Sequence, residues 1–191
     1  MLEDLIVSKV RTKLLWLFFS NPQEIYYVRD LVRKVGEEIN ATRRELAHLE
    51  QSGILKKEPR GNRLYYWLNK NYLFFPDLLA IVAKETGLGA EIIKNKNRLG
   101  KVDFCLFSRK FVERKERKED EVDILVVGEI VMAELASLIR GEEERRGKEI
   151  NYTVMTNEEF IFRKRRRDPF LLGILESGKI MIIGDEEELF L

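Results

Sequence analysis

The stretch that decides the fold of this chain is Tyr26–Leu68, YYVRDLVRKVGEEINATRRELAHLEQSGILKKEPRGNRLYYWL. Its pattern predicts a short helix over residues 28–35, a turn at Gly36, a second helix, and two strands joined at residues 59–63. The second helix ends at Gly53, since glycine readily adopts the left-handed conformation that stops a helix. Its inward stripe repeats at helical spacing. That stripe consists of Ile39, Thr42, Leu46 and Leu49.

The opposite side of the second helix is polar. At about 100° per residue it carries Asn40, Ala41, Arg44 and His48. An arginine can bind guanine through two hydrogen bonds, an asparagine can bind adenine in the same way, and an alanine can contact the thymine methyl group. Arg43 lies nearer the predicted core edge and suits a phosphate contact better.

The hairpin that follows is basic. Its predicted cationic and turn residues are Lys56, Lys57, Arg60, Asn62 and Arg63. Such side chains can hold the phosphate backbone or enter the minor groove beside a binding site. A helix-turn-helix followed by a basic hairpin is typical of modules that read double-stranded DNA.

A second interpretation treats these residues as solvated charges on a small helical domain that binds protein. Glu37 and Glu38 favour it, because carboxylates repel phosphates, although carboxylates also suit a helix N-terminus. The order of helix, glycine turn, helix, glycine stop and basic hairpin is more specific than any single residue. We therefore predict DNA binding, with a pure protein-interaction role as the alternative.

Residues 8–68 resemble winged-helix transcriptional regulators of the ArsR-like kind. The segment 44–55, RELAHLEQSGIL, is similar to their pattern REL..LE..G.L. The resemblance implies a homodimer on an operator with two-fold or nearly two-fold symmetry.

Composition limits the class of protein. Residues 1–70 hold 13 Lys or Arg against 9 Asp or Glu, a net charge of +4, whereas residues 71–191 hold 21 against 24, a net charge of −3. The basic half is thus the predicted DNA-binding half. The single cysteine, Cys105, fits a reducing cytoplasm, and we expect no signal peptide and no membrane span. The 35% of charged residues hints at a thermophilic source.

The predicted fold class is α+β, in three parts. Residues 1–70 form the winged helix-turn-helix domain, residues 71–99 connecting or dimerisation helices broken by Gly87 and Gly89, and residues 100–191 a mixed sheet flanked by helices. The last part alternates strands and helices. Strands are expected at 102–107, 121–127, 149–155 and 179–183, helices at 130–146 and 170–176, and an acidic tail at 184–188.

Residues 100–191 resemble the minimal nucleotidyltransferase fold. That family carries Gly followed by Gly or Ser after its first strand, and a pair of carboxylates two residues apart on the second strand. The resemblance implies a site where the carboxylates hold Mg²⁺ against ATP. Here Ser108 matches the serine, Phe107 replaces the glycine, and Glu121 and Asp123 follow after residues 109–120.

The third carboxylate of that family falls where this chain has Asn151, or less suitably Glu149. An asparagine cannot neutralise Mg²⁺, and Phe107 would crowd a phosphate. We therefore expect Ser108, Glu121 and Asp123 to be a vestigial nucleotide site, with no catalytic residue, metal or cofactor. The alternative is a Mg²⁺-dependent enzyme that transfers a nucleotidyl group from ATP to a protein or small molecule.

The whole chain is similar to an archaeal and bacterial arrangement in which a winged helix is fused to a nucleotidyltransferase-like domain. Those relatives read GS.A.G......SD.DLLV where this chain has residues 107–126. The resemblance implies a cytoplasmic, dimeric transcriptional regulator.

One further basic run, residues 163–167, has two interpretations. It could contact the DNA backbone. It could instead be a solvated helix face or a partner for the acidic stretches 142–144 and 185–188, which we favour.

Overall fold

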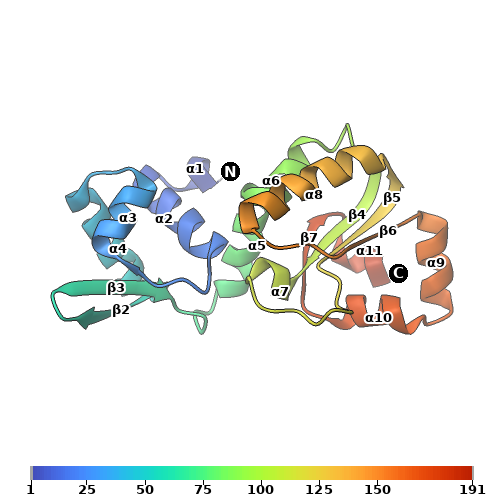
Figure 1. Ribbon diagram of the computed structural model, residues 1–191. Helices are drawn as coiled ribbons and strands as arrows, with labels where there is room; N and C mark the ends of the chain where they lie inside the picture. The colour runs from blue at the N-terminus through green and yellow to red at the C-terminus, as the bar shows by residue number, and fades with distance from the viewer. Residues whose placement is uncertain (1, 191) are drawn as a thin grey trace. The chain divides into compact units, whose positions relative to one another are not determined.

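The computed structural model describes residues 2–190 and has a mixed α+β fold with two sheets (Figure 1). The chain divides into two compact units between Glu85 and Thr86. The first unit contains α1 (Leu2–Leu5), α2 (Lys9–Ser20), β1 (Tyr26–Tyr27), α3 (Val28–Val35), α4 (Ile39–Gln51), β2 (Leu55–Arg60), β3 (Arg63–Leu68) and α5 (Phe75–Glu85).

The first unit has the expected helix-turn-helix and hairpin. Gly36 ends α3 in the left-handed conformation, with φ of 68°, and α4 begins three residues later. The two strands of the hairpin pair in register, from Leu55 opposite Leu68 to Arg60 opposite Arg63. Large apolar side chains from α2, α3 and α4 fill the core beneath it. They include Leu14, Phe18, Leu31, Leu46 and Leu49.

The first sheet has a third strand that the sequence did not predict. Tyr26 and Tyr27 form β1 and pair with Tyr66 and Tyr65, giving the strand order β1-β3-β2. We expected these tyrosines only to lead into the first helix. Two residues are too few to show the alternation that identifies a strand.

The first compact unit extends to Glu85, beyond the predicted boundary at residue 70. The helix α5 packs against α2, with the rings of Phe19 and Phe75 5.7 Å apart. Trp16 Nε1 also donates a hydrogen bond to Glu85, at 3.3 Å. Burial of an apolar stripe on α5 thus draws this helix into the first unit, so residues 71–85 are not a free connector.

The second unit contains α6 (Gly87–Lys94), β4 (Gly100–Ser108), α7 (Arg109–Val112), β5 (Ile124–Ile130), α8 (Met132–Arg146), β6 (Tyr152–Met155), α9 (Asn157–Arg165), α10 (Pro169–Glu176), β7 (Lys179–Ile183) and α11 (Glu186–Phe190). Its sheet order is β6-β5-β4-β7. Only β5 and β6 are parallel among these neighbours. The mixed sheet flanked by helices therefore agrees with the predicted fold class.

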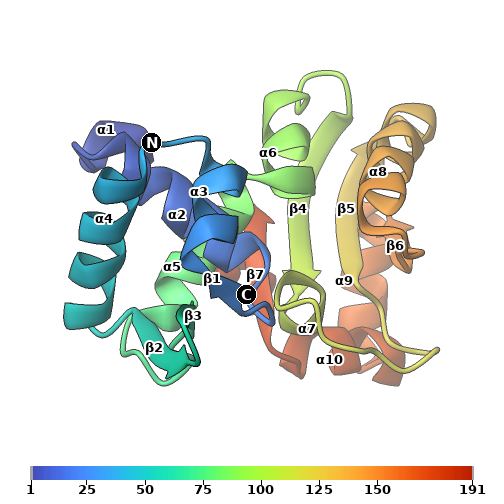
Figure 2. The ribbon, with the colours of Figure 1, turned by 60° about the vertical axis from the view of Figure 1, so that its left-hand side comes forward.

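Helices cover both faces of this sheet. Figures 1 and 2 show α6 and α8 on one side and α9, α10 and α11 on the other. The second group packs on a continuous apolar cluster. That cluster includes Leu106, Leu125, Val127, Phe160 and Leu171.

Several predictions for this unit were wrong, including the start of the strand expected at 149–155, which begins at Tyr152. The break before α6 lies at Thr86, and Gly89 is buried inside α6 instead of interrupting it. The strand β5 begins at Ile124 instead of residue 121 and ends at Ile130 instead of residue 127, so Gly128 lies within it. The acidic tail forms α11, because Leu189 is buried against the sheet.

Within residues 2–190, no helix is both long enough and apolar enough to cross a membrane.

We predict that Gly128→Ala destabilises the protein by about 2 kcal/mol or more, because Gly128 has a φ of 143° and an added Cβ would collide with the carbonyl oxygen of Lys101. Urea unfolding measures the loss. Gly141→Ala is the matched control, since a Cβ there meets nothing within 4 Å and helix α8 should gain about 0.5–1 kcal/mol. Equal stability of Gly128→Ala and the unaltered protein would contradict the prediction.

Candidate nucleic-acid interface

The helix α4 is fixed to the first unit by one side. Thr42, Leu46 and Leu49 are buried there. Beside them, Glu45 accepts hydrogen bonds from Arg11 Nε at 2.7 Å and from Ser8 Oγ at 2.8 Å. Partial burial opposes ionisation of Glu45, but these hydrogen bonds outweigh it and lower the pKa of the carboxyl group. The rotation of α4 about its own axis is therefore set by both packing and an ion pair.

The two carboxylates before α4 have structural partners. Glu37 accepts a hydrogen bond from Lys13 Nζ at 2.6 Å. Glu38 caps the helix by accepting from the backbone N–H of Ala41 at 2.8 Å. Hydrogen bonds from the backbone N–H groups of Asn40 and Ala41 lower the pKa of Glu38. These charges therefore have roles within the fold, and their presence does not require a protein partner.

The outward side of α4 is open to solvent. The side chains of Asn40, Arg43, Arg44 and His48 are exposed, and Ala41 is half-buried. Within residues 2–190, none of the four exposed side chains makes a hydrogen bond or salt bridge. Arg43 is exposed like Arg44, although the sequence placed it nearer the core edge. These donors are free to bind a partner.

The hairpin residues behave in two ways. Lys56, Asn62 and Arg63 are exposed. Lys57 is exposed too, but its Nζ donates a 2.9 Å hydrogen bond to Glu50 of α4, and this bond raises the pKa of the ammonium group. Lys57 is therefore less available to DNA than its neighbours, because α4 supplies it with a carboxylate.

The two arginines beside the hairpin turn lie over tyrosine rings. Arg60 lies 5.2 Å from the ring centroid of Tyr65, and Arg63 lies 4.9 Å from that of Tyr27. Arg60 also pairs with Glu58 at 2.6 Å. A cation held over an aromatic face keeps its outward N–H groups available. Figure 2 shows this hairpin beside the C-terminal end of α4.

The predicted nucleotide motif of the second unit has structural roles. Ser108 caps α7, its Oγ accepting from the N–H of Phe111 at 3.1 Å. Phe107 is buried, and its ring meets that of Phe111 edge to face at 5.3 Å. Phe107 therefore fills the core beside the strand end where the resemblance places a glycine.

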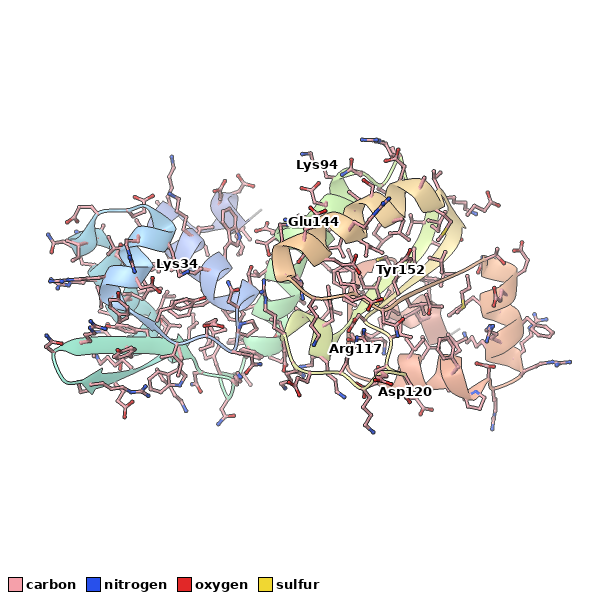
Figure 3. The ribbon with its side chains drawn as sticks, viewed as in Figure 1. Lys34, Lys94, Arg117, Asp120, Glu144 and Tyr152 are labelled. Carbon is pink, nitrogen blue, oxygen red and sulfur yellow. The ribbon has the colours of Figure 1, made fainter. Side chains whose placement is uncertain are left out.

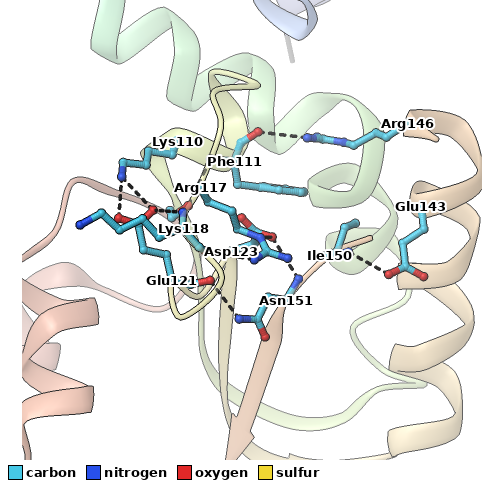
Figure 4. A network of polar contacts seen from close by, with 11 residues as sticks. Lys110, Phe111, Arg117, Lys118, Glu121, Asp123, Glu143, Arg146, Ile150 and Asn151 are labelled. Carbon is cyan, nitrogen blue, oxygen red and sulfur yellow. Dashed lines mark hydrogen bonds and ion pairs between the residues drawn. The ribbon is translucent and has the colours of Figure 1, made fainter. Parts of the chain in front are cut away.

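The carboxylates of Glu121 and Asp123 bind different cations within one network of polar contacts (Figure 4). Glu121 accepts from Lys110 Nζ at 2.6 and 2.8 Å and from the backbone of Lys118 at 3.0 Å. Asp123 is only 5% exposed and accepts from Arg117 Nε at 2.7 Å. Both residues precede β5, so the alternation of a strand does not aim them at one point.

The remaining residue of the predicted motif also bonds within the protein. Asn151 donates its backbone N–H to Asp123 at 3.0 Å and its side-chain amide to the carbonyl of Glu121 at 2.9 Å. Glu149 is exposed. Among the described residues, no group of three or more His, Cys, Asp or Glu side chains is arranged to hold a metal ion.

The basic run at residues 163–167 is partly satisfied locally. Arg163 pairs with Glu159 at 2.8 Å and with Asp168 at 3.5 Å. Arg166 lies over the ring of Phe162 at 4.6 Å. The partners of Arg163 thus come from its own helix and from the residue that caps α10, and not from the acidic stretches 142–144 and 185–188.

The sequence also missed a basic cavity in the second unit. It is lined by Arg114, Arg117, Arg146 and Lys148, among others. The available signal was the charged run at residues 109–120, which we used only as the spacing between Ser108 and Glu121. Figure 3 places Arg117 and Asp120 in this run.

Comparison with known proteins gives little similarity. No family model matches the sequence, and no curated protein matches it. A solved structure titled reduced HlyU from Vibrio cholerae N16961 is similar to part of the chain, with 15% sequence identity over 44% of this chain and 80% of HlyU and a TM-score of 0.35. A likeness at this level is too slight to support a functional conclusion.

We predict that Asp123→Ala lowers the free energy of unfolding by up to about 3 kcal/mol, because it leaves the half-buried guanidinium of Arg117 without its counter-ion. Glu121→Ala is the matched control, and its loss should be far smaller since Lys110 remains solvated. Urea unfolding of both variants measures the difference. Similar losses for the two would contradict a structural role specific to Asp123.

Proposed function

We propose that this chain is a sequence-specific transcriptional regulator that binds double-stranded DNA through α4 and the β2–β3 hairpin. The observation that carries the proposal is the outward face of α4, where Asn40, Arg44 and His48 are exposed while the opposite face is locked by Leu46 and Glu45. An α-helix is about 10–12 Å wide, and the major groove of B-DNA is about 12 Å wide.

Each side chain has a role in this proposal. Arg44 reads guanine, Asn40 reads adenine, and Ala41 contacts a thymine methyl group near the helix N-terminus. His48 is a further candidate one turn along from Arg44. Arg43 binds a phosphate. Base contacts of this kind confer specificity, whereas phosphate contacts set the register of the protein on the duplex.

The hairpin would supply backbone contacts. Lys56, Arg60, Asn62 and Arg63 carry this role, and Lys57 contributes less because Glu50 binds it. The stacking of Arg60 and Arg63 on tyrosines supports it, since guanidinium groups held in place lose less conformational freedom when they bind phosphate.

The second unit is proposed to hold paired copies or to sense a ligand, and not to catalyse. Mg²⁺-dependent nucleotidyl transfer from ATP would need Glu121 and Asp123 at one metal ion, but each carboxylate binds a protein cation instead. We therefore propose that DNA binding requires no metal or cofactor. A site of action in the cytoplasm suits Cys105, a buried thiol whose pKa burial raises to about 12.

The decisive comparison is between a variant that loses a base contact and a variant that loses contacts to the DNA backbone. Arg44→Ala should weaken binding to the selected duplex about 10- to 100-fold while nonspecific binding changes little, because a two-bond contact to guanine discriminates by about 1–3 kcal/mol. The double variant Arg60→Ala/Arg63→Ala should weaken selected and random duplexes alike. It should also lower the slope of log affinity against log salt concentration by about two, because two fewer phosphates are neutralised and fewer counter-ions are released.

Gel shifts with genomic fragments over a range of salt concentrations measure both effects. Lys84→Ala is the control, since this exposed lysine lies on α5 in the same unit. Equal affinity of the unaltered protein for all duplexes, unchanged by Arg44→Ala, would contradict sequence-specific reading by α4. Absence of DNA binding at any ionic strength would favour the protein-interaction role.

We further propose that the DNA-bound form is a homodimer, as a two-fold symmetric operator requires. Analytical ultracentrifugation should show two chains per operator duplex, with half-sites about one helical turn apart. Saturation of a full operator by one chain would contradict the dimer while leaving single-site binding intact. An operator cut to one half-site is the control and should bind one chain.

A further inference from the structure

A basic cavity of about 110 Å³ lies in the second unit between the loop after α7 and the segment after α8. About 10–15 Å³ of such volume holds one water molecule, so the cavity has room for a small ligand. Five cations line the cavity against two carboxylates, Asp123 and Glu149. The cations are Arg114, Lys115, Arg117, Arg146 and Lys148.

Two of the guanidinium groups are held rigidly. Arg146 donates to Glu142 at 2.6 Å and to the carbonyl of Phe111 at 3.0 Å, and it lies 3.9 Å from the centroid of the Phe111 ring. Arg117 donates to Asp123 and to the carbonyl of Lys118 (Figure 4). Their side chains are 18% and 16% exposed. Within residues 2–190, the Nη2 group of neither arginine donates a hydrogen bond.

Two other cations lack a counter-ion. Within the described part of the chain, the side chains of Arg114 and Lys148 make no hydrogen bond or salt bridge, whereas Lys115 pairs with Glu113. Burial lowers the pKa of Arg146, and the like charge of Arg114 lowers it further. The cavity thus holds positive charges that repel one another.

The backbone at Arg114 is strained. Its φ is 54°, a left-handed conformation that a side chain with a Cβ seldom adopts. Such strain persists only where the surroundings impose it, and it is concentrated at functional sites. Arg114 lines the cavity together with Arg146.

The carboxylates at the cavity do not cancel this charge. The Oδ2 atom of Asp123 already accepts from Arg117 and from the backbone of Asn151. Glu149 is exposed, as are Arg114 and Lys148, so one unpaired carboxylate faces two unpaired cations. The cavity therefore keeps an excess of positive charge.

We propose that this cavity binds a phosphate group, as the free ion or as part of a small phosphorylated ligand, without a metal ion. Arg114 and Lys148 supply the charge that neutralises it, and Arg146 and Arg117 donate from fixed positions. A tetrahedral dianion suits these donors, since separate phosphate oxygens can each accept a charge-assisted hydrogen bond from the Nη2 group of a fixed arginine. The cavity differs from the motif of Ser108 and Glu121, where the sequence predicted Mg²⁺ and a triphosphate.

Isothermal titration of the full chain with inorganic phosphate and pyrophosphate tests the proposal, at constant ionic strength and with a chelator present. Both anions should bind, whereas chloride at equal ionic strength should give no saturable heat. The double variant Arg114→Gly/Lys148→Ala should weaken binding at least tenfold. Glycine suits the left-handed backbone at position 114, so this variant should fold, and circular dichroism checks that it does.

Lys94→Ala/Lys96→Ala is the control of matched charge. Figure 3 shows Lys94 far from Arg117, and both lysines are exposed. The control should bind phosphate as the unaltered protein does. Three results would overturn the proposal: no saturable binding, equal weakening in both double variants, or binding that appears only with Mg²⁺. The measurement uses no DNA, so its outcome is independent of the DNA-binding proposal.

Discussion

The orientation of α4 depends on its attachment to α2. Leu46 and Leu49 bury one side of the helix, and the ion pair of Glu45 with Arg11 adds a directional contact beside them. A helix fixed in this way can present only one set of side chains to solvent. Because Asn40 and Arg44 belong to that set, the same interactions that stabilise the unit also define the surface proposed to meet DNA.

In the second unit, too, carboxylates pair with cations of the protein itself. Asp123 and Glu121, at positions where the resemblance implies metal ligands, each bind a cation of the protein. Asp123 pairs with Arg117 of the same loop, and it connects this loop to the start of β6 by accepting the backbone N–H of Asn151. A carboxylate used in this way stabilises the fold, and its charge no longer favours a metal ion. The excess charge of the nearby cavity is positive, which favours an anion.

The sequence predicted the elements with strong local signals. The periodicity of α4, the glycine at position 36 and the residues 59–63 of the hairpin identified the helix-turn-helix and its wing, because these features depend on neighbours along the chain. The strand β1 was missed because two residues, Tyr26 and Tyr27, are too few to show the alternation of apolar and polar side chains that identifies a strand. The docking of α5 was missed because an apolar stripe does not reveal which partner buries it.

The sites were predictable only in part. The exposed face of α4 follows from helical geometry, so Asn40 and Arg44 could be named in advance. The attachment of Lys57 to Glu50 could not, because it depends on how the hairpin meets α4. The basic cavity brings Arg114 together with Arg146, 32 positions apart in the sequence, and no local pattern records that proximity.

The most direct test of the central claim is a nuclear magnetic resonance titration of the isotopically labelled chain with its selected duplex. The account predicts that the largest shifts occur at the exposed positions of α4, above all Asn40 and Arg44, and at the hairpin around Arg60. Shifts confined to the basic run at residues 163–167, with α4 unchanged, would contradict the claim that α4 is the DNA-reading helix.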